Sequence, residues 1–135
     1  HLQFIIYNVQ FVLLMNRDDM KNRLKMFAVR IIRLVDKLPN TSAGRAIGNQ
    51  IVRSGTSPGA NYRAACVGKS DKDFLNKLKM VVEELDETAD WLELIMDLEL
   101  VKPDLLQDLY LENKELLKIV VKSILTMRDK VNGKV

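Results

Sequence analysis

Apolar residues recur every three or four positions along most of this 135-residue chain. Between residues 22 and 38 the spacing is regular, and the apolar positions are Leu24, Phe27, Ala28, Ile31, Leu34, Val35 and Leu38. Such a stripe is typical of an amphipathic helix that buries one face. Pro39 disfavours helical geometry at the residue before it, so the pattern predicts a helix over 22–38.

A second helix is predicted over 42–67, and its middle, SGTSPGA, consists of small or helix-breaking residues. Pro58 lacks a backbone N–H and clashes with the carbonyl four residues earlier, so we predict a kink or a break there. A glycine inside a helix costs roughly 1 kcal/mol relative to alanine. We therefore interpret Gly55, Gly59 and Ala60 as positions where another helix approaches closely, and not as a linker.

The clearest helical pattern covers 70–99. Ser70 begins it as an N-cap, and its apolar seam alternates steps of four and three through Phe74, Leu78, Val81, Leu85, Thr88, Leu92 and Ile95. A last helix is predicted over 103–131, because Pro103 suits a first helical turn. Four helices joined by short links predict an all-α, up-down-up-down four-helix bundle.

The first residues of the chain do not continue this pattern. The apolar run from Phe4 to Met15 is too short to span a bilayer, and no basic segment precedes it as in a signal peptide. We predict that residues 1–19 form an N-terminal extension and that residues 20–135 form the bundle domain.

Charge is strongly segregated along the chain, although its net value is only +3. Residues 17–79 carry 14 Lys or Arg against 5 Asp or Glu, whereas residues 80–112 carry 11 acids against one lysine. This asymmetry favours either a polyanionic partner or subunits that meet basic surface to acidic surface. The single cysteine, Cys66, cannot form an internal disulfide, so we expect a reduced, cytoplasmic location.

Motifs for catalysis, metals or cofactors are weak or missing. GKS at 68–70 lacks the glycine five residues earlier that a phosphate-binding loop needs. The only histidine is His1, which excludes histidine-dependent triads and most zinc sites. The acids of the third helix lack the Glu-x-x-His pairs of carboxylate metal sites in bundles. We predict a protein that is not an enzyme and has no cofactor, metal, small-molecule substrate or membrane partner.

Two sets of residues are candidate contacts. The basic set is either a solvated face or a set of phosphate contacts to RNA, and comprises Arg23, Arg30, Arg33, Lys37, Arg45, Arg53, Arg63, Lys72 and Lys79. For Arg53 and Arg63, which flank the close-packed stretch, a pairing with Asp or Glu of the third helix is the alternative. The third helix has apolar residues around more of its circumference than one bundle can bury, which favours an oligomer. The candidate subunit-interface residues are Tyr62, Val82, Ala89, Trp91 and Met96.

The stretch QIVRSGTSPGANYRAACVGKSDKDFLNKL, followed by EELDETADWLELI, resembles the four-helix-bundle family of 23S ribosomal RNA intervening-sequence proteins. The resemblance covers roughly residues 22–130, and its most specific pieces are RSGTS, GANYR and WLEL. Family members usually carry Val or Ile where Pro58 stands, and often Glu where Ala64 stands. The first departure favours a bent second helix, and the second removes an acid that can pair with an arginine.

This resemblance implies a bundle that assembles into a ring-like homopentamer. It also implies kinship with the accessory variability determinant of diversity-generating retroelements, a basic pentamer that works with a reverse transcriptase and RNA. Two hypotheses follow for the function. The chain is either a non-enzymatic oligomer that binds RNA or a ribonucleoprotein through its basic face, or an adaptor ring that binds another protein and no nucleic acid.

Overall fold

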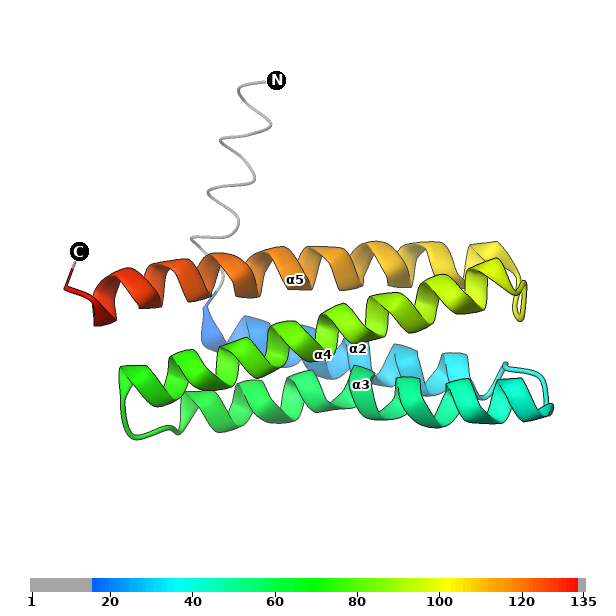
Figure 1. Cartoon of the computed structure of the whole chain (residues 1–135), viewed down its shortest axis with the longest axis horizontal. Helices are drawn as coiled ribbons and strands as arrows, with labels where there is room; N and C mark the ends of the chain where they lie inside the picture. Colours follow the sequence, from blue (N-terminus) through cyan, green and yellow to red (C-terminus); the bar gives the residue numbers. More distant parts are fainter. Residues whose placement is uncertain (1–15, 134–135) are drawn as a thin grey trace, which may run out of the picture.

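The computed structural model describes residues 16–133, which form four helices and no strand. In chain order they are α2 (Arg17–Val35), α3 (Ser42–Cys66), α4 (Asp71–Asp97) and α5 (Pro103–Val131). Successive helices run in opposite directions (Figure 1). The predicted all-α four-helix bundle is therefore confirmed. No helix within the described part of the chain has the length and apolar character needed to cross a membrane.

Side-chain caps explain where three of the helices begin. Asn16, Thr41 and Ser70 precede α2, α3 and α4, and each side-chain oxygen accepts a hydrogen bond from the backbone N–H three residues later, at 2.8, 3.1 and 3.1 Å. These bonds satisfy N–H groups that lack a partner within the helix. α5 has no such cap but begins at Pro103, which has no N–H to satisfy.

The bounds of α2 differ from the predicted 22–38. It begins at Arg17 and ends at Val35, and the backbone N–H groups of Lys37 and Leu38 bond three residues back in a tight turn toward Pro39. The influence of the proline therefore extends further back than the sequence pattern indicated. Of the predicted extension, residues 1–15 lie outside the described residues, whereas 17–19 form the first turn of α2.

The core lies along the axis of the bundle and takes its side chains from all four helices. The largest fully buried side chains include Phe27 of α2, Ile51 of α3, Leu85 of α4 and Leu116 of α5. α3 packs extensively on α4 and α2, and α4 packs extensively on α5, but α2 and α5 meet at only a few positions. The bundle is therefore closed on three sides and loosely joined along its α2–α5 seam.

The predicted break at Pro58 is wrong, because α3 continues through this residue as one uninterrupted helix (Figure 1). Pro58 is buried, and the neighbouring glycines are packed against α2. A Cβ atom added to Gly55 would lie 2.8 Å from Ile31 Cγ1, so no larger residue fits without a shift. Packing of this closeness compensates for the roughly 3 kcal/mol that an internal proline costs. The interpretation of the small residues as a close-packing device is confirmed for Gly55 and Gly59, but it is wrong for Ala60, which is exposed.

Three polar side chains are fully buried at the middle of the bundle. Thr88 Oγ1 of α4 donates a hydrogen bond to Ser54 Oγ of α3 at 2.9 Å. Asn113 of α5 reaches the backbone of α4, where Nδ2 lies 3.0 Å from the Leu85 carbonyl and Oδ1 lies 3.1 Å from the Ala89 N–H, in the amide orientation that these partners require. Because these polar atoms have partners, they hold the helices in register and do not form a reactive site.

Candidate nucleic-acid interface

Three of the candidate cations lie together on the side of α2 that faces α5. Arg30, Arg33 and Lys37 line a shallow groove whose apolar floor is formed by Leu34 of α2 with Leu105 and Leu109 of α5. Arg33 and Lys37 are exposed and Arg30 is half-buried. The loose α2–α5 seam creates this groove, since few side chains bridge the two helices along it.

The cations of this groove are available to an external partner. Arg30, Arg33 and Lys37 make no ion pair within 4.0 Å to any residue that the structure describes. Arg45 lies just beyond, in the first turn of α3, where it is exposed and donates from Nη1 to Asn40 Oδ1 at 2.9 Å. Arg45 lines a separate hollow between the end of α2 and the start of α3, and it is not part of the α2–α5 groove.

Arg23 lies further along the same seam and has a different role. Its guanidinium donates two hydrogen bonds to the Glu112 carboxylate of α5, from Nε at 2.8 Å and from Nη2 at 2.7 Å. Both side chains are about one-fifth exposed. The hydrogen bonds to Glu112 raise the pKa of Arg23, and burial only partly opposes this effect. This bidentate pair ties α5 to α2, so Arg23 is a structural residue.

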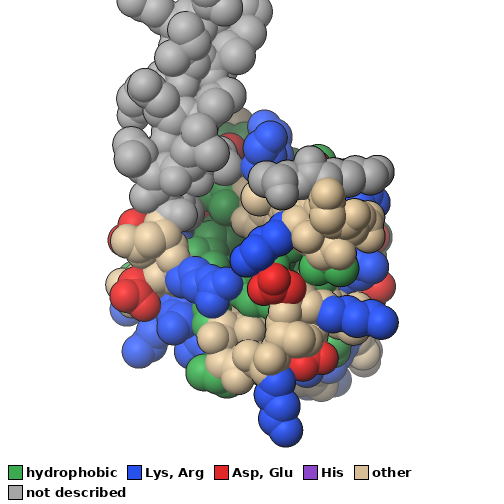
Figure 2. All heavy atoms as spheres, turned by 90° about the vertical axis from the view of Figure 1, so that its left-hand side faces the viewer, with side chains coloured by type: hydrophobic (Ala, Val, Ile, Leu, Met, Phe, Trp, Pro, Cys, Tyr) green, Lys and Arg blue, Asp and Glu red, His purple; other side chains and the backbone are tan. Residues whose placement is uncertain are grey.

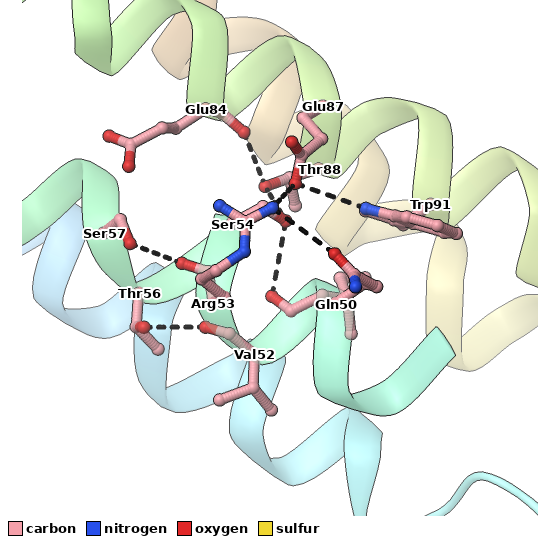
Figure 3. A network of polar contacts seen from close by, with 11 residues as sticks. Gln50, Val52, Arg53, Ser54, Thr56, Ser57, Glu84, Glu87, Thr88 and Trp91 are labelled. Carbon is pink, nitrogen blue, oxygen red and sulfur yellow. Dashed lines mark hydrogen bonds and ion pairs between the residues drawn. The ribbon is translucent and has the colours of Figure 1, made fainter. Parts of the chain in front are cut away.

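Arg53 also acts within the molecule. As Figure 3 shows, its guanidinium lies between Gln50 of its own helix and Glu87 of α4, with which it forms an ion pair. Trp91 Nε1 donates to the same Glu87 carboxylate at 3.4 Å. Next to this group, Asn61 Nδ2 donates to Glu84 Oε1 at 2.7 Å. Arg53 and Ser54 of the RSGTS stretch and Asn61 of the GANYR stretch therefore link α3 to α4.

A second basic groove lies on the other side of α2, against α3. It is lined by Lys21 and Lys25 of α2, by Arg63 of α3, and by Gly59, whose missing side chain leaves the space open. Lys21 has a weak ion pair with Asp18 at 3.8 Å. Sequence analysis had singled out only Arg63 here. Lys21 and Lys25 could have been found from their spacing of four, which places them on one helical face.

Lys72 and Lys79 are exposed on α4 and lie away from both grooves. Figure 2 shows the end of the bundle near the start of α4 and the end of α5, where blue Lys and Arg side chains are mixed with red Asp and Glu side chains. An ion pair at this end joins Lys130 to Asp71 at 3.4 Å. The nine candidate cations therefore do not form one surface, and the structure brings together only those around α2.

The interface candidates are divided in the same way. Tyr62 is 7% exposed and Ala89 is 1% exposed, so both belong to the core of a single chain. Val82, Trp91 and Met96 are half-buried at its edge. Ala89 is covered because α5 crosses α4 at Asn113, a packing that the sequence of α4 alone does not show. The large apolar residues that α4 does expose are Met80, Leu94 and Leu98.

Nothing in the described residues suggests a catalytic centre. No group of three His, Cys, Asp or Glu side chains within residues 16–133 is placed to hold a metal ion. Cys66 is half-buried and lies near Tyr62, whose pKa is raised to about 12, mainly by burial and then by the neighbouring thiol. A phenol held neutral in this way packs edge-to-face on Phe74, with ring centroids 6.4 Å apart, and is a core group.

Comparison with known protein families gives the class of this protein. Residues 18–122 match the family of 23S rRNA-intervening sequence proteins, and the chain belongs to this family. A similar solved structure is the 1.70 Å crystal structure of a protein of unknown function from the S23 ribosomal protein family of Bacteroides thetaiotaomicron VPI-5482. It is 36% identical over 78% of this chain and 97% of the other, with a TM-score of 0.73. No functionally curated protein matches the sequence.

Proposed function

We propose that this protein is a non-enzymatic, oligomeric RNA-binding protein whose principal RNA contacts lie in the α2–α5 groove. The observation that carries the proposal is the grouping in one groove of Arg30, Arg33 and Lys37, which make no ion pair with described residues. Long cationic side chains along a groove suit a phosphate backbone, because they act by charge and do not need to read bases. Membership of a family named for an rRNA intervening sequence is consistent with this ligand class.

The second groove adds to the same surface. Lys21, Lys25 and Arg63 lie across α2 from the first groove, so α2 carries cations on both of its flanks. A strand of RNA that follows α2 would meet cations from both grooves along its path. Arg23 and Arg53 are removed from the contact set, because each already holds a carboxylate.

Assembly into a ring, proposed here as a homopentamer, would strengthen this binding. Contacts that are weak in one subunit gain from the high effective concentration of the other subunits once the first has bound. Light scattering at micromolar concentration tests the assembly itself, and a monomeric mass would rule it out.

The RNA proposal is tested by changing the groove charges. The variant Arg30→Gln/Arg33→Gln/Lys37→Gln should bind single-stranded RNA at least ten-fold more weakly in a mobility-shift titration at low salt. Its slope of log K against log salt should be flatter by about 2 per subunit, since each phosphate contact on a single strand contributes roughly 0.7. The matched control, Lys69→Gln/Lys102→Gln/Arg128→Gln, removes the same charge at exposed positions outside both grooves and should change the slope far less.

Helicity by circular dichroism should be unchanged in both variants. Equal losses in the variant and the control would mean that RNA responds to net charge alone, and the groove would not be the site. If the wild-type protein binds no RNA at low salt, the proposal fails, and a protein partner of the ring becomes the better explanation of the basic groove.

A further inference from the structure

α4 carries a line of apolar side chains on its outer surface that the bundle does not cover. Leu94 is 42% exposed and Leu98 is 53% exposed, and the half-buried Trp91 lies one helical step before them. Asp90 and Asp97, both exposed, flank Leu94 at spacings of four and three, which places them on the adjacent face. We call these five residues the acidic stripe.

α5 carries a stripe of the opposite charge. Leu117, Val121 and Leu125 follow one another at intervals of four and line a shallow apolar hollow together with Lys118 and Lys122. Val121 is 40% exposed and Leu125 is 43% exposed. We call these five residues the basic stripe. Neither stripe includes a residue of α2, so both leave the proposed RNA grooves accessible.

The two stripes cannot meet within one chain. The hydrogen bond from Tyr110 to Glu93 and the ion pair between Lys130 and Asp71 fix the antiparallel register of α4 and α5. In this register Leu94 lies level with residues near 108, about 13 residues along α5 from Val121. At 1.5 Å per residue the stripes are centred about 20 Å apart along the bundle.

We infer that the acidic stripe of one copy of this chain docks on the basic stripe of the next copy. Each stripe presents a row of apolar side chains one helical turn apart, with charges of opposite sign beside it. Aromatic residues such as Trp91 are common energetic centres of interfaces. Because the contact joins two different surfaces, it is heterologous, and repeated contacts of this type generate a ring when the rotation closes. The inference rests on the proposed assembly and specifies its interface.

Two variants, each with one disrupted stripe, test the inference. Leu94→Asp/Leu98→Asp disrupts the acidic stripe, and Val121→Asp/Leu125→Asp disrupts the basic stripe. Size-exclusion chromatography with light scattering should show each variant alone as a 15.5 kDa monomer. Mixed in equal amounts they should form a heterodimer of about 31 kDa, twice 15.5 kDa, because one intact stripe of each kind remains. The matched control, Met26→Asp/Ile32→Asp, changes exposed apolar residues of α2 and should remain oligomeric.

The possible outcomes separate the inference from the proposal on which it rests. A monomeric wild-type protein contradicts the assembly itself. If the wild type is oligomeric and either stripe variant keeps its mass, or if the mixture yields no heterodimer, the stripes are not the interface.

A charge-reversal set covers the case in which an aspartate variant fails to fold. Asp90→Lys/Asp97→Lys and Lys118→Asp/Lys122→Asp should each dissociate the oligomer. The four changes combined in one chain should restore it. Failure of the combined variant to regain the wild-type mass, while folded by circular dichroism, would overturn the pairing.

Discussion

The two sides of α2 show two different ways of joining helices. Toward α3, the backbones approach so closely that a Cβ atom at Gly55 would lie 2.8 Å from Ile31 Cγ1. Toward α5, the helices meet at few positions, and a groove with Arg30, Arg33 and Lys37 runs between them. Close approach at Gly55 leaves no room for a side chain, whereas separation along the α5 side leaves space that cationic stems can line. The tightest packing of α2 is therefore toward α3, and the principal candidate binding groove lies at the α2–α5 seam, with the second groove near Gly59.

The largest expected loss of stability follows from a substitution at the close contact between α2 and α3. Gly55→Leu forces a side chain into space that Ile31 already fills, so the helices must separate or α3 must bend. We expect a loss of about 3 kcal/mol in the free energy of unfolding, at the upper end for overpacked cores. Urea denaturation followed by circular dichroism measures the loss.

Gly59→Ala is the matched control for this substitution. A Cβ atom at Gly59 would lie 3.4 Å from Arg63 Nη1, the end of a flexible side chain, and 3.6 Å from Leu24 Cβ, so it fits with little displacement. Because alanine is a better helix former, we expect a gain of up to about 1 kcal/mol. Equal effects at the two glycines would show that α2 and α3 are not held in the packing described above.

The second expected effect is a dependence of stability on pH, caused by Tyr62 near the end of α3. Burial raises the pKa of Tyr62 to about 12 from its ordinary value of 10, so the fold favours the neutral phenol. The resulting stabilisation is fully present below pH 10 and is lost as the pH rises from 10 through 12. Its size is about 2 kcal/mol, since each pKa unit corresponds to 1.36 kcal/mol and part of the effect is screened.

Comparison with Tyr62→Phe isolates this contribution. The variant should lose less stability than the wild type between pH 9 and pH 11.5 in urea denaturation, because phenylalanine does not titrate. Parallel pH curves for the two proteins would show that the Tyr62 hydroxyl ionises without cost and is therefore not buried.

The fold could be predicted from the sequence because its cues are local. The apolar seam of α4, its Ser70 cap and Pro103 at the start of α5 act within one or two turns, and each predicted helix formed. The predicted break did not occur at Pro58, where packing against α2 outweighs the local preference, and the alternative of a kink stays a prediction. This result depends on α2, which comes from a distant part of the sequence. The residues around Pro58 alone therefore could not predict it.

The candidate site could be predicted only in part, for the same reason. The spacing of Arg30, Arg33 and Lys37 indicated a shared face of one helix, and the structure places them in one groove. Spacing does not show which carboxylate lies opposite a cation. Arg23 was therefore predicted as a phosphate contact, although Glu112 holds it. For Arg53 the sequence left open a pairing with an acid of the third helix, and Glu87 of α4 is that partner. These pairings depend on how the helices are arranged around the bundle.

The smallest expected loss of stability concerns the α2–α5 seam, where Arg23 pairs with Glu112. Arg23→Met keeps much of the apolar stem but removes both hydrogen bonds to Glu112, leaving a partly buried carboxylate without that partner. Water still reaches the site, since both side chains are about one-fifth exposed, so we expect a loss of only about 1 kcal/mol in the free energy of unfolding.

The loss of stability in Arg23→Met should be local. Hydrogen exchange should accelerate in α2 and α5 near this pair and remain unchanged where α3 meets α4 around Ser54 and Thr88. Uniform acceleration across all four helices would mean that the seam is as strongly coupled to the core as the close-packed side, and the proposed division between the two sides of α2 would not hold.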